Sequence, residues 1–292
     1  MGQGWRSGTA RICEVAAGTA EVPGPSVRDR IALQVRPDNR DGACCFHHGL
    51  DCIGCCREDH IALESHQVVG EREYSEMTTN VLVTFYSTYG HIHRMALAVA
   101  EGAESVPDIT VRLRRIAELE EARKALSAQD AYVRAQQAQA DIPAVTHDDL
   151  RWADGIAWGT PTRYGNMSAQ MKQFVDTTGG LWLKGELEDK ATGIFTSTGT
   201  IHGGQETTIL TALVPLIHLG MVFVGTPYGQ NPQLLVTDGI GGSPYGPGTL
   251  AGTDGSRQPI EAELTTARNL GSRLARVAGR LKGLRVSRAS AP

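Results

Sequence analysis

The stretch Val-Leu-Val-Thr-Phe-Tyr-Ser-Thr-Tyr-Gly-His-Ile at residues 81–92 constrains the fold more than any other part of the chain. Its first half carries β-branched and aromatic side chains and no charge, which predicts a strand covered on both faces within a parallel sheet. A short turn with hydroxyl groups and a glycine follows. Apolar side chains then recur every three or four residues, at Ile92, Met95, Ala96, Val99 and Ala103. This spacing predicts a helix with one buried face.

The turn at residues 87–91 lies between a strand's carboxyl end and a helix's amino end, where free backbone N–H groups and the helix dipole attract an anion. We expect a phosphate there. No Lys or Arg occurs from Ser87 to His93, so backbone amides and the hydroxyls of Ser87 and Thr88 would have to hold it. The turn is neither GxxxxGK[ST] nor GxGxxG, which argues against a nucleoside triphosphate and an ordinary dinucleotide site. A tight connection that needs Gly90 for its backbone explains the turn equally well by itself.

The same order of strand, polar loop and helix recurs along the chain. Strands are expected at residues 109–113, 152–159, 191–196 and 221–224, and the first of these alternates apolar and polar side chains as an edge strand does. Polar loops follow two of them, at residues 160–168 and 197–204. The helices after those loops carry apolar side chains at helical spacing: Met171, Phe174 and Val175 in one, Leu210, Leu213, Val214 and Ile217 in the other.

Five strands alternating with helices predict an α/β fold, an open parallel sheet with helices on both faces. Ligands of such sheets bind outside the carboxyl ends of the strands, where the strand order reverses. Three polar loops converge there, so one phosphate-bearing ligand is favoured over three unrelated turns.

Three further segments complete the chain. Residues 119–140 are good helix formers with little apolar stripe and are expected to be a surface excursion. Residues 226–255 are rich in glycine and proline, a length that is typical of a lid or a subunit contact. Pro259 is expected to open the last helix, which is acidic at its start and basic near its end, and residues 285–292 are expected to be a frayed basic tail.

The composition excludes some classes of protein. Residues 79–292 carry 20 basic and 20 acidic side chains, which leaves no basic footprint for nucleic acid and no acidic bias for docking on a basic partner. No apolar run is long enough to span a membrane, and residues 1–10 show no secretory signal. A cytoplasmic protein is expected.

All six cysteines lie in the first 56 residues, with His47 and His48 among them. A zinc or iron–sulfur site there is compatible with the spacing, but the usual second CxxC pair is missing and an unstructured segment is favoured. A third interpretation is that residues 1–76 are not part of the native protein, because Met77-Thr78-Thr79-Asn80 reads as a start. No metal-binding residue is assigned.

Four ordered motifs carry a family resemblance: Tyr-Ser-Thr-Tyr-Gly-His-Ile at 86–92, Gly-Thr-Pro-Thr-Arg-Tyr-Gly-Asn-Met-Ser at 159–168, Ser-Thr-Gly-Thr at 197–200 with Gly-Gly-Gln-Glu at 203–206, and Gly-Ser-Pro-Tyr-Gly at 242–246 with Asp-Gly-Ser-Arg-Gln-Pro at 254–259. Together they resemble the WrbA family of flavodoxin-like NAD(P)H:quinone oxidoreductases. The resemblance divides the chain into an extension at 1–78 that is disordered or non-native, an FMN-binding domain at 79–283 and a basic tail at 284–292. Residues 119–141 fit the family only loosely and are expected to touch no site residue.

The resemblance implies noncovalent FMN and a two-electron transfer from NADH or NADPH to a quinone. The residues that it implies for FMN are Ser87, Thr88, Tyr89, Gly90, His91, Ile92, Thr162, Arg163, Tyr164, Ser197, Thr198, Gly199, Thr200, Ile201, His202 and His218. Tyr89 resembles the residue that also contacts NAD(P)H, and Trp182 the residue that covers the substrate. His218 resembles a histidine that reaches the FMN of a neighbouring subunit, because the family forms homotetramers.

The cofactor would carry the chemistry: hydride passes from nicotinamide to flavin, the first product leaves, and the quinone takes both electrons in the same place, which predicts ping-pong kinetics. Plainer roles stay open for single residues. Tyrosines in the loops can cap core strands, Trp182 can form a subunit contact and His218 a solvated helix end. Arg163 can pair with a carboxylate, and Asp254 with Arg257 can pin the long loop.

Three other functions remain as alternatives. A flavodoxin-type carrier would pass single electrons without turning over a substrate of its own. An iron–sulfur flavoprotein would use the cysteine-rich segment, and a scaffold protein would have lost its ligand.

Overall fold

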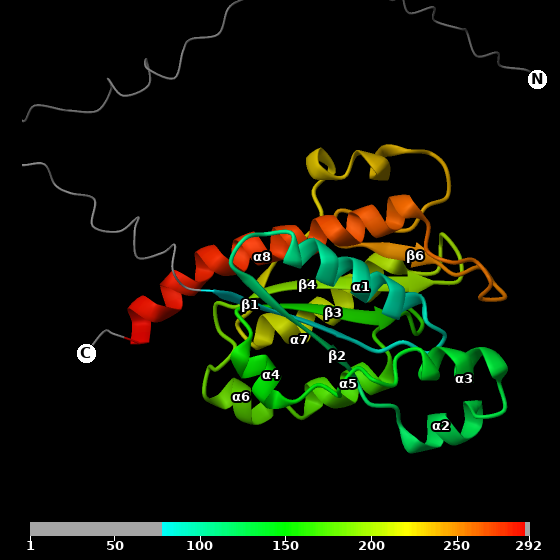
Figure 1. The fold of residues 1–292 in the computed structure, drawn as a ribbon, viewed down its shortest axis with the longest axis horizontal. Coiled ribbons are helices and arrows are strands. Elements are labelled where there is room, and N and C mark those ends of the chain that lie inside the picture. Colours follow the sequence, from blue (N-terminus) through cyan, green and yellow to red (C-terminus); the bar gives the residue numbers. More distant parts are fainter. Residues whose placement is uncertain (1–77, 290–292) are drawn as a thin grey trace, which may run out of the picture. The chain divides into compact units, whose positions relative to one another are not determined.

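A computed structural model describes residues 78–289 of the chain, so the cysteine-rich segment lies outside the described residues. The sheet is built from β1 (Thr79–Phe85), β2 (Ile109–Arg115), β3 (Gly155–Pro161), β4 (Ala191–Thr198) and β5 (Val222–Phe223). Its order is β2-β1-β3-β4-β5 and all pairs are parallel. This order is that of flavodoxin-like sheets, with the switch point between β1 and β3. The predicted five-stranded parallel sheet, with β2 at its edge, is confirmed (Figure 1).

Helices cover both faces of the sheet, and each face has its own apolar core. On one face lie α1 (His91–Glu104) and α8 (Glu261–Ala289), which pack against each other (Figure 1). The other face is covered by α4 (His147–Trp152), α5 (Ala169–Asp176), α6 (Gly179–Leu183) and α7 (Gln205–His218). The predicted buried stripe of α1 is confirmed, because the five residues that define it are all buried. β1 is fully covered from Val81 to Phe85, as its composition predicts.

Three of the four residues in the predicted apolar stripe of α7 do not face the core. Leu210, Val214 and Ile217 are exposed and only Leu213 packs against the core, whereas Ile209 and Leu216 are fully buried. This helix is apolar on both sides, and the sheet takes the side that carries Thr208, Ile209, Ala212 and Leu216. Helical spacing alone therefore does not tell which of two apolar faces is buried.

The fifth strand of the sheet comes in two pieces. β5 pairs with Ala191 and Thr192 at the start of β4, and β6 (Gly248–Leu250) pairs with residues 196–198 at its end. The chain between them contains the short helices η3 (Tyr228–Gln230) and η4 (Pro232–Leu235). The stretch at residues 226–255, which the sequence predicts to be irregular, thus contains the strand β6. With three residues, one of them glycine, β6 is too short to be recognised from periodicity.

The surface excursion forms α2 (Glu120–Leu126) and α3 (Asp130–Gln137). No residue of α2 is buried, but Tyr132 and Ala135 of α3 are. The two helices lie at the end of the sheet toward which β1, β3 and β4 point (Figure 1).

α8 begins two residues after Pro259 and continues to Ala289, so most of the predicted basic tail belongs to its last turns. Arg285 hydrogen-bonds to the carboxylate of Asp154, which also accepts from Lys282 at 3.1 Å. Within the described residues, no helix is both long and apolar enough to cross a membrane.

Candidate functional site

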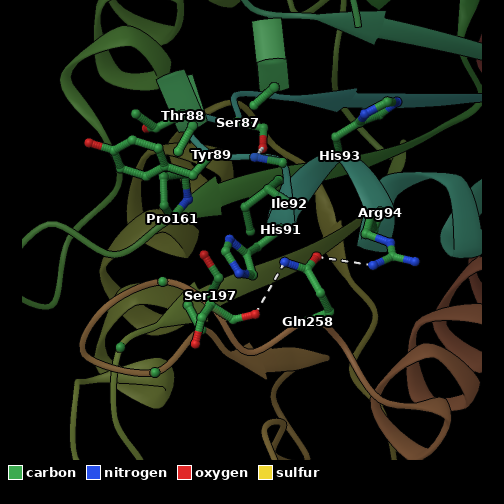
Figure 2. A pocket seen from close by; sticks show the side chains of 18 of the residues that line it. Ser87, Thr88, Tyr89, His91, Ile92, His93, Arg94, Pro161, Ser197 and Gln258 are labelled. Atoms are coloured by element: carbon green, nitrogen blue, oxygen red, sulfur yellow. Dashed lines mark hydrogen bonds between the residues drawn. The ribbon is translucent and has the colours of Figure 1, made fainter. Parts of the chain in front are cut away.

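One cavity of about 1030 Å³ lies at the carboxyl end of the sheet, and we call it the site cavity. The loops after β1, β3, β4 and β6 line it, together with α3. Figure 2 shows Ser87, His91, Pro161 and Ser197 from these loops around the same space. The prediction that the three polar loops meet at the switch point is therefore confirmed, and a fourth loop at residues 251–258 joins them.

The loop at residues 87–92, here called the phosphate loop, presents unpaired backbone donors to this cavity. Ser87 and Thr88 are buried, yet among the described residues no protein acceptor faces the amides of Thr88 and Tyr89. α1 follows without a side-chain cap, so the N–H groups of its first turn are free as well. Gly90 has a φ of 95°, a conformation in which a residue with a side chain would be strained, and its amide donates to Ser87 Oγ at 3.1 Å. Amides that line a cavity without a protein acceptor indicate a ligand that accepts hydrogen bonds.

A chain of hydrogen bonds behind the phosphate loop determines whether the Thr88 hydroxyl donates or accepts. The Glu118 carboxylate accepts from Tyr86 Oη at 2.8 Å and from Tyr132 Oη at 3.1 Å. Because the Tyr86 proton goes to Glu118, the Tyr86 oxygen accepts the Thr88 proton at 3.3 Å. Burial raises the pKa of Tyr86, so its hydroxyl keeps the proton that it donates. Thr88 Oγ1 is therefore left as an acceptor, and the Ser87 hydroxyl is the loop's side-chain donor.

Arg163 supplies the positive charge that the phosphate loop itself lacks. Its Nη2 donates to Thr88 Oγ1 at 3.0 Å and its Nη1 to the carbonyl of Thr162 at 2.8 Å. Among the described residues it has no carboxylate partner within ion-pair distance. The alternative of a pairing with a carboxylate is therefore not what this structure shows.

The segment that fits the family loosely contributes to the site, contrary to expectation. Gln129, Arg134 and Ala135 line the site cavity, and Tyr89 Oη donates to Gln129 Oε1 at 2.9 Å. Behind the loop, Gln136 and Gln139 donate to its carbonyl groups. The sequence signal was polar side chains at helical spacing, Tyr132 and Gln136 within α3 and Gln139 just after its end.

The buried carboxylate of Glu263 anchors the loop after β6. Glu263 is fully buried and pairs with Arg257 at 2.9 Å, and it also accepts from Thr249 Oγ1 at 2.8 Å. The sequence suggested that Asp254 pairs with Arg257, but it does not. Asp254 instead accepts hydrogen bonds from the amide and the hydroxyl of Ser256. His91 joins this loop to the phosphate loop, since its Nε2 lies 2.9 Å from the carbonyl of Arg257.

Most of the predicted FMN residues meet in the site cavity, and some do not. The residues that line it are Ser87, Thr88, Tyr89, Gly90, His91, Ile92, Thr162, Arg163, Ser197, Thr198 and Gly199. Those that do not line it are Tyr164, Thr200, Ile201, His202 and His218, and Trp182, the predicted substrate residue, does not line it either. The cavity also has lining residues that the sequence did not single out, among them His93, Arg94 and Gln258 (Figure 2).

Local geometry explains where the outlying residues lie. Tyr164 and Gly165 both have positive φ and close a hairpin in which Arg163 and Asn166 exchange backbone hydrogen bonds, and the Tyr164 side chain is fully exposed. His218 ends α7, thirteen residues after Gln205, which is about 20 Å along a helix axis. Trp182 is exposed on α6, at the end of the sheet where the strands begin (Figure 1). In a single chain, neither His218 nor Trp182 can reach the site cavity.

No cluster of three or more metal-binding side chains occurs in residues 78–289. The site cavity is instead rich in amides, hydroxyls and arginine side chains, with Asp254 as the carboxylate among its lining residues. This donor set suits a phosphate-bearing organic ligand.

Comparisons with known proteins identify the family of the chain. Residues 83–232 match the family described as NADPH-dependent FMN reductase. An NAD(P)H dehydrogenase (quinone) of Geobacter sulfurreducens is 52% identical over 206 residues, which cover 70% of this chain and 100% of the relative. One from Aromatoleum aromaticum is 50% identical over 203 residues, covering 69% and 96%. Among solved structures, a flavodoxin, WrbA-like protein from Agrobacterium tumefaciens is 27% identical with a TM-score of 0.48, covering 69% and 98%.

Proposed function

The chain belongs to the WrbA-like family of FMN-dependent NAD(P)H:quinone oxidoreductases, and we propose that it reduces quinones through an FMN held in the site cavity. Its activity is FMN-dependent quinone reduction by NAD(P)H. The observation that carries the assignment of the site is the phosphate loop, which lines the cavity and whose Thr88 and Tyr89 amides have no acceptor in the described chain.

The residues present fit FMN. The cavity volume of about 1030 Å³ is in the range of cofactor pockets. The phosphate would accept from the amides of Thr88 and Tyr89, from the first turn of α1 and from the Ser87 hydroxyl, a donor set typical of phosphate at a helix amino end. Thr162, Thr198 and Gly199 would lie beside the rest of the cofactor, because they line the cavity from the neighbouring strand ends.

When bound, FMN supplies the redox chemistry by taking a hydride from NAD(P)H and delivering two electrons to the quinone. The protein positions the cofactor and the substrates and shields them from solvent. Tyr89, whose hydroxyl is held by Gln129, offers an aromatic surface at the cavity rim. Arg163 is held by Thr88 with its charge toward the cavity, where it stabilises negative charge on bound groups. Both substrates would use the same space in turn, so we expect ping-pong kinetics.

The test is an anaerobic absorbance titration of the FMN-loaded protein. We expect NADH or NADPH to bleach the flavin bands and menadione to restore them, with parallel double-reciprocal lines in steady state. A protein that retains FMN but is not reduced by either nicotinamide would act as a one-electron carrier instead. A protein that does not bind FMN would refute the assignment altogether.

We also propose a homotetramer located in the cytoplasm, the compartment that supplies NAD(P)H. Exposed apolar side chains support the assembly: Leu210, Val214 and Ile217 form one face of α7, and Trp182 and Leu183 are exposed on α6. Burying such side chains between subunits is favourable. Assembly would also give His218 and Trp182 access to a neighbour's cavity, which their own chain does not allow. Tyr164, Thr200, Ile201 and His202 remain proposed FMN residues at the rim.

A further inference from the structure

We propose that Gln136 and Gln139 of the α3 segment are positioning residues for the phosphate group of FMN. These two glutamines act by orienting two peptide groups of the phosphate loop. The inference rests on the proposed function, because it assumes that the loop binds a phosphate monoester.

Both glutamines hold carbonyl groups of the loop. Gln139 Nε2 donates to the carbonyl of Ser87 at 2.9 Å, and Gln136 Nε2 to the same carbonyl at 3.0 Å. Gln136 Nε2 also lies 3.2 Å from the carbonyl of Thr88. A carbonyl only accepts, so the amide nitrogen of each glutamine must face the loop. The Ser87 carbonyl thus has two donors, which is its full capacity.

Because a peptide group is planar, fixing its carbonyl also fixes the direction of its N–H on the other side of the loop. In a trans peptide the carbonyl and the following N–H point in opposite directions, and the described chain contains no cis peptide. Fixing the Ser87 carbonyl toward α3 therefore turns the Thr88 N–H away from the glutamines. Fixing the Thr88 carbonyl does the same for the Tyr89 N–H. These two amides are among those of the phosphate loop that have no protein acceptor in the described structure.

The arrangement is preorganised because it is buried. Gln139 is 3% exposed and Ser87 is equally covered, so water does not compete for these hydrogen bonds. Without the glutamines, the Ser87 carbonyl would be left buried and unsatisfied, and rotation of the peptide would relieve this. Rotation would direct the carbonyl toward the anion and remove an N–H from it. The α3 segment, which lies outside the motifs of the family resemblance, would in this way set the affinity for the cofactor's phosphate.

The test compares FMN with riboflavin, which has the same ring and no phosphate. Gln136→Met and Gln139→Met keep the size and helix propensity of the side chain but remove its donor. Gln137→Met is the matched control, because Gln137 is exposed on the same helix and makes no side-chain hydrogen bond in the described structure. Dissociation constants are measured by fluorescence titration of the flavin-free protein.

We expect each of Gln136→Met and Gln139→Met to weaken FMN binding about tenfold, the effect of one lost hydrogen bond to a charged group. Riboflavin binding should change less than about twofold, and the control should change neither. An unchanged FMN affinity in both variants, or an equal loss for FMN and riboflavin, would overturn the inference in favour of a packing role for α3.

Two further outcomes are separable. If the wild-type protein binds FMN no more tightly than riboflavin, the proposed phosphate site fails before the glutamines are considered. If Gln139→Met does not fold, Gln136→Met decides the matter, since Gln136 is half-buried and contacts both carbonyls.

Discussion

At the scale of single residues, the electrostatics of the phosphate loop come from outside it. The loop contains no Lys or Arg, and the charge that reaches it belongs to Arg163, 75 positions later. The role of Thr88 is likewise set from a distance, because Tyr86 donates its proton to Glu118 and its oxygen then accepts the Thr88 proton. The sequence predicted that both hydroxyls of the loop hold the phosphate. In the described structure Thr88 accepts from Arg163, and that both hydroxyls hold the phosphate stays a prediction.

His91 provides a pH test at this scale. Burial lowers the pKa of His91 from its ordinary value of 6.5, and its Nε2–H donates to the carbonyl of Arg257. The unfolded chain therefore binds more protons than the folded one as the pH falls through 6.5, so the free energy of unfolding decreases there. We expect His91→Gln, which retains a donor but does not titrate, to reduce this slope by up to about 1.4 kcal/mol per pH unit.

Urea unfolding of the flavin-free protein between pH 5.5 and 7.5 measures the effect. Burial also lowers the pKa of His93, so part of the slope will remain in the variant. Equal slopes in wild type and His91→Gln would show that His91 has the same pKa in the folded and unfolded states, contrary to the expectation.

At the scale of elements, the position of the phosphate loop depends on how closely α1 approaches α8. A Cβ atom on Gly271 would lie 1.9 Å from the carbonyl oxygen of Val99, and one on Gly102 would lie 2.0 Å from that of Arg268. Only glycine allows the two backbones this contact. α1 is thereby held against the sheet with its amino end at the site cavity.

Gly271→Ala should separate the two helices. We expect a loss of about 1–3 kcal/mol in the free energy of unfolding, since the clash with backbone outweighs the better helix propensity of alanine. Gly180→Ala in α6 is the control, because nothing lies within 4 Å of the added atom. Urea denaturation measures the free energy of unfolding of both variants. A Gly271→Ala protein as stable as Gly180→Ala would contradict the close contact between α1 and α8.

At the scale of the whole molecule, the exposed apolar face of α7 and the distant positions of His218 and Trp182 have one common explanation, the proposed tetramer. Leu210, Val214 and Ile217 recur on one side of the helix while the sheet covers the other. An apolar stripe of this kind on a protein with an ordinary charged surface favours a contact between subunits.

Val214→Glu is expected to shift the protein from tetramer to smaller species, because a carboxylate would be buried in the contact without a partner. Sedimentation equilibrium measures the mass. Val133→Glu, on the partly exposed side of α3, is the control and should leave the mass unchanged. A tetramer that withstands Val214→Glu would place the subunit contact elsewhere, and a monomeric wild type would refute the assembly.

The sequence by itself determined the sheet, the helix that follows β1 and the meeting of the polar loops. It could do so because each depends on local periodicity and on the rule that parallel strands end at one edge. The strand β6 escaped prediction because three residues carry too little pattern, and the face of α7 because both of its sides are apolar.

Only the tertiary structure decided which distant groups complete the loops. Gln136, Gln139 and Arg163 contact the phosphate loop across separations of 49, 52 and 75 residues, and Glu118 contacts Tyr86 just before the loop across 32. No local pattern encodes such contacts. Hydrogen-bond direction and burial are properties of the assembled neighbours. They decide which donors are free for a ligand and which are already used to hold the loop in place.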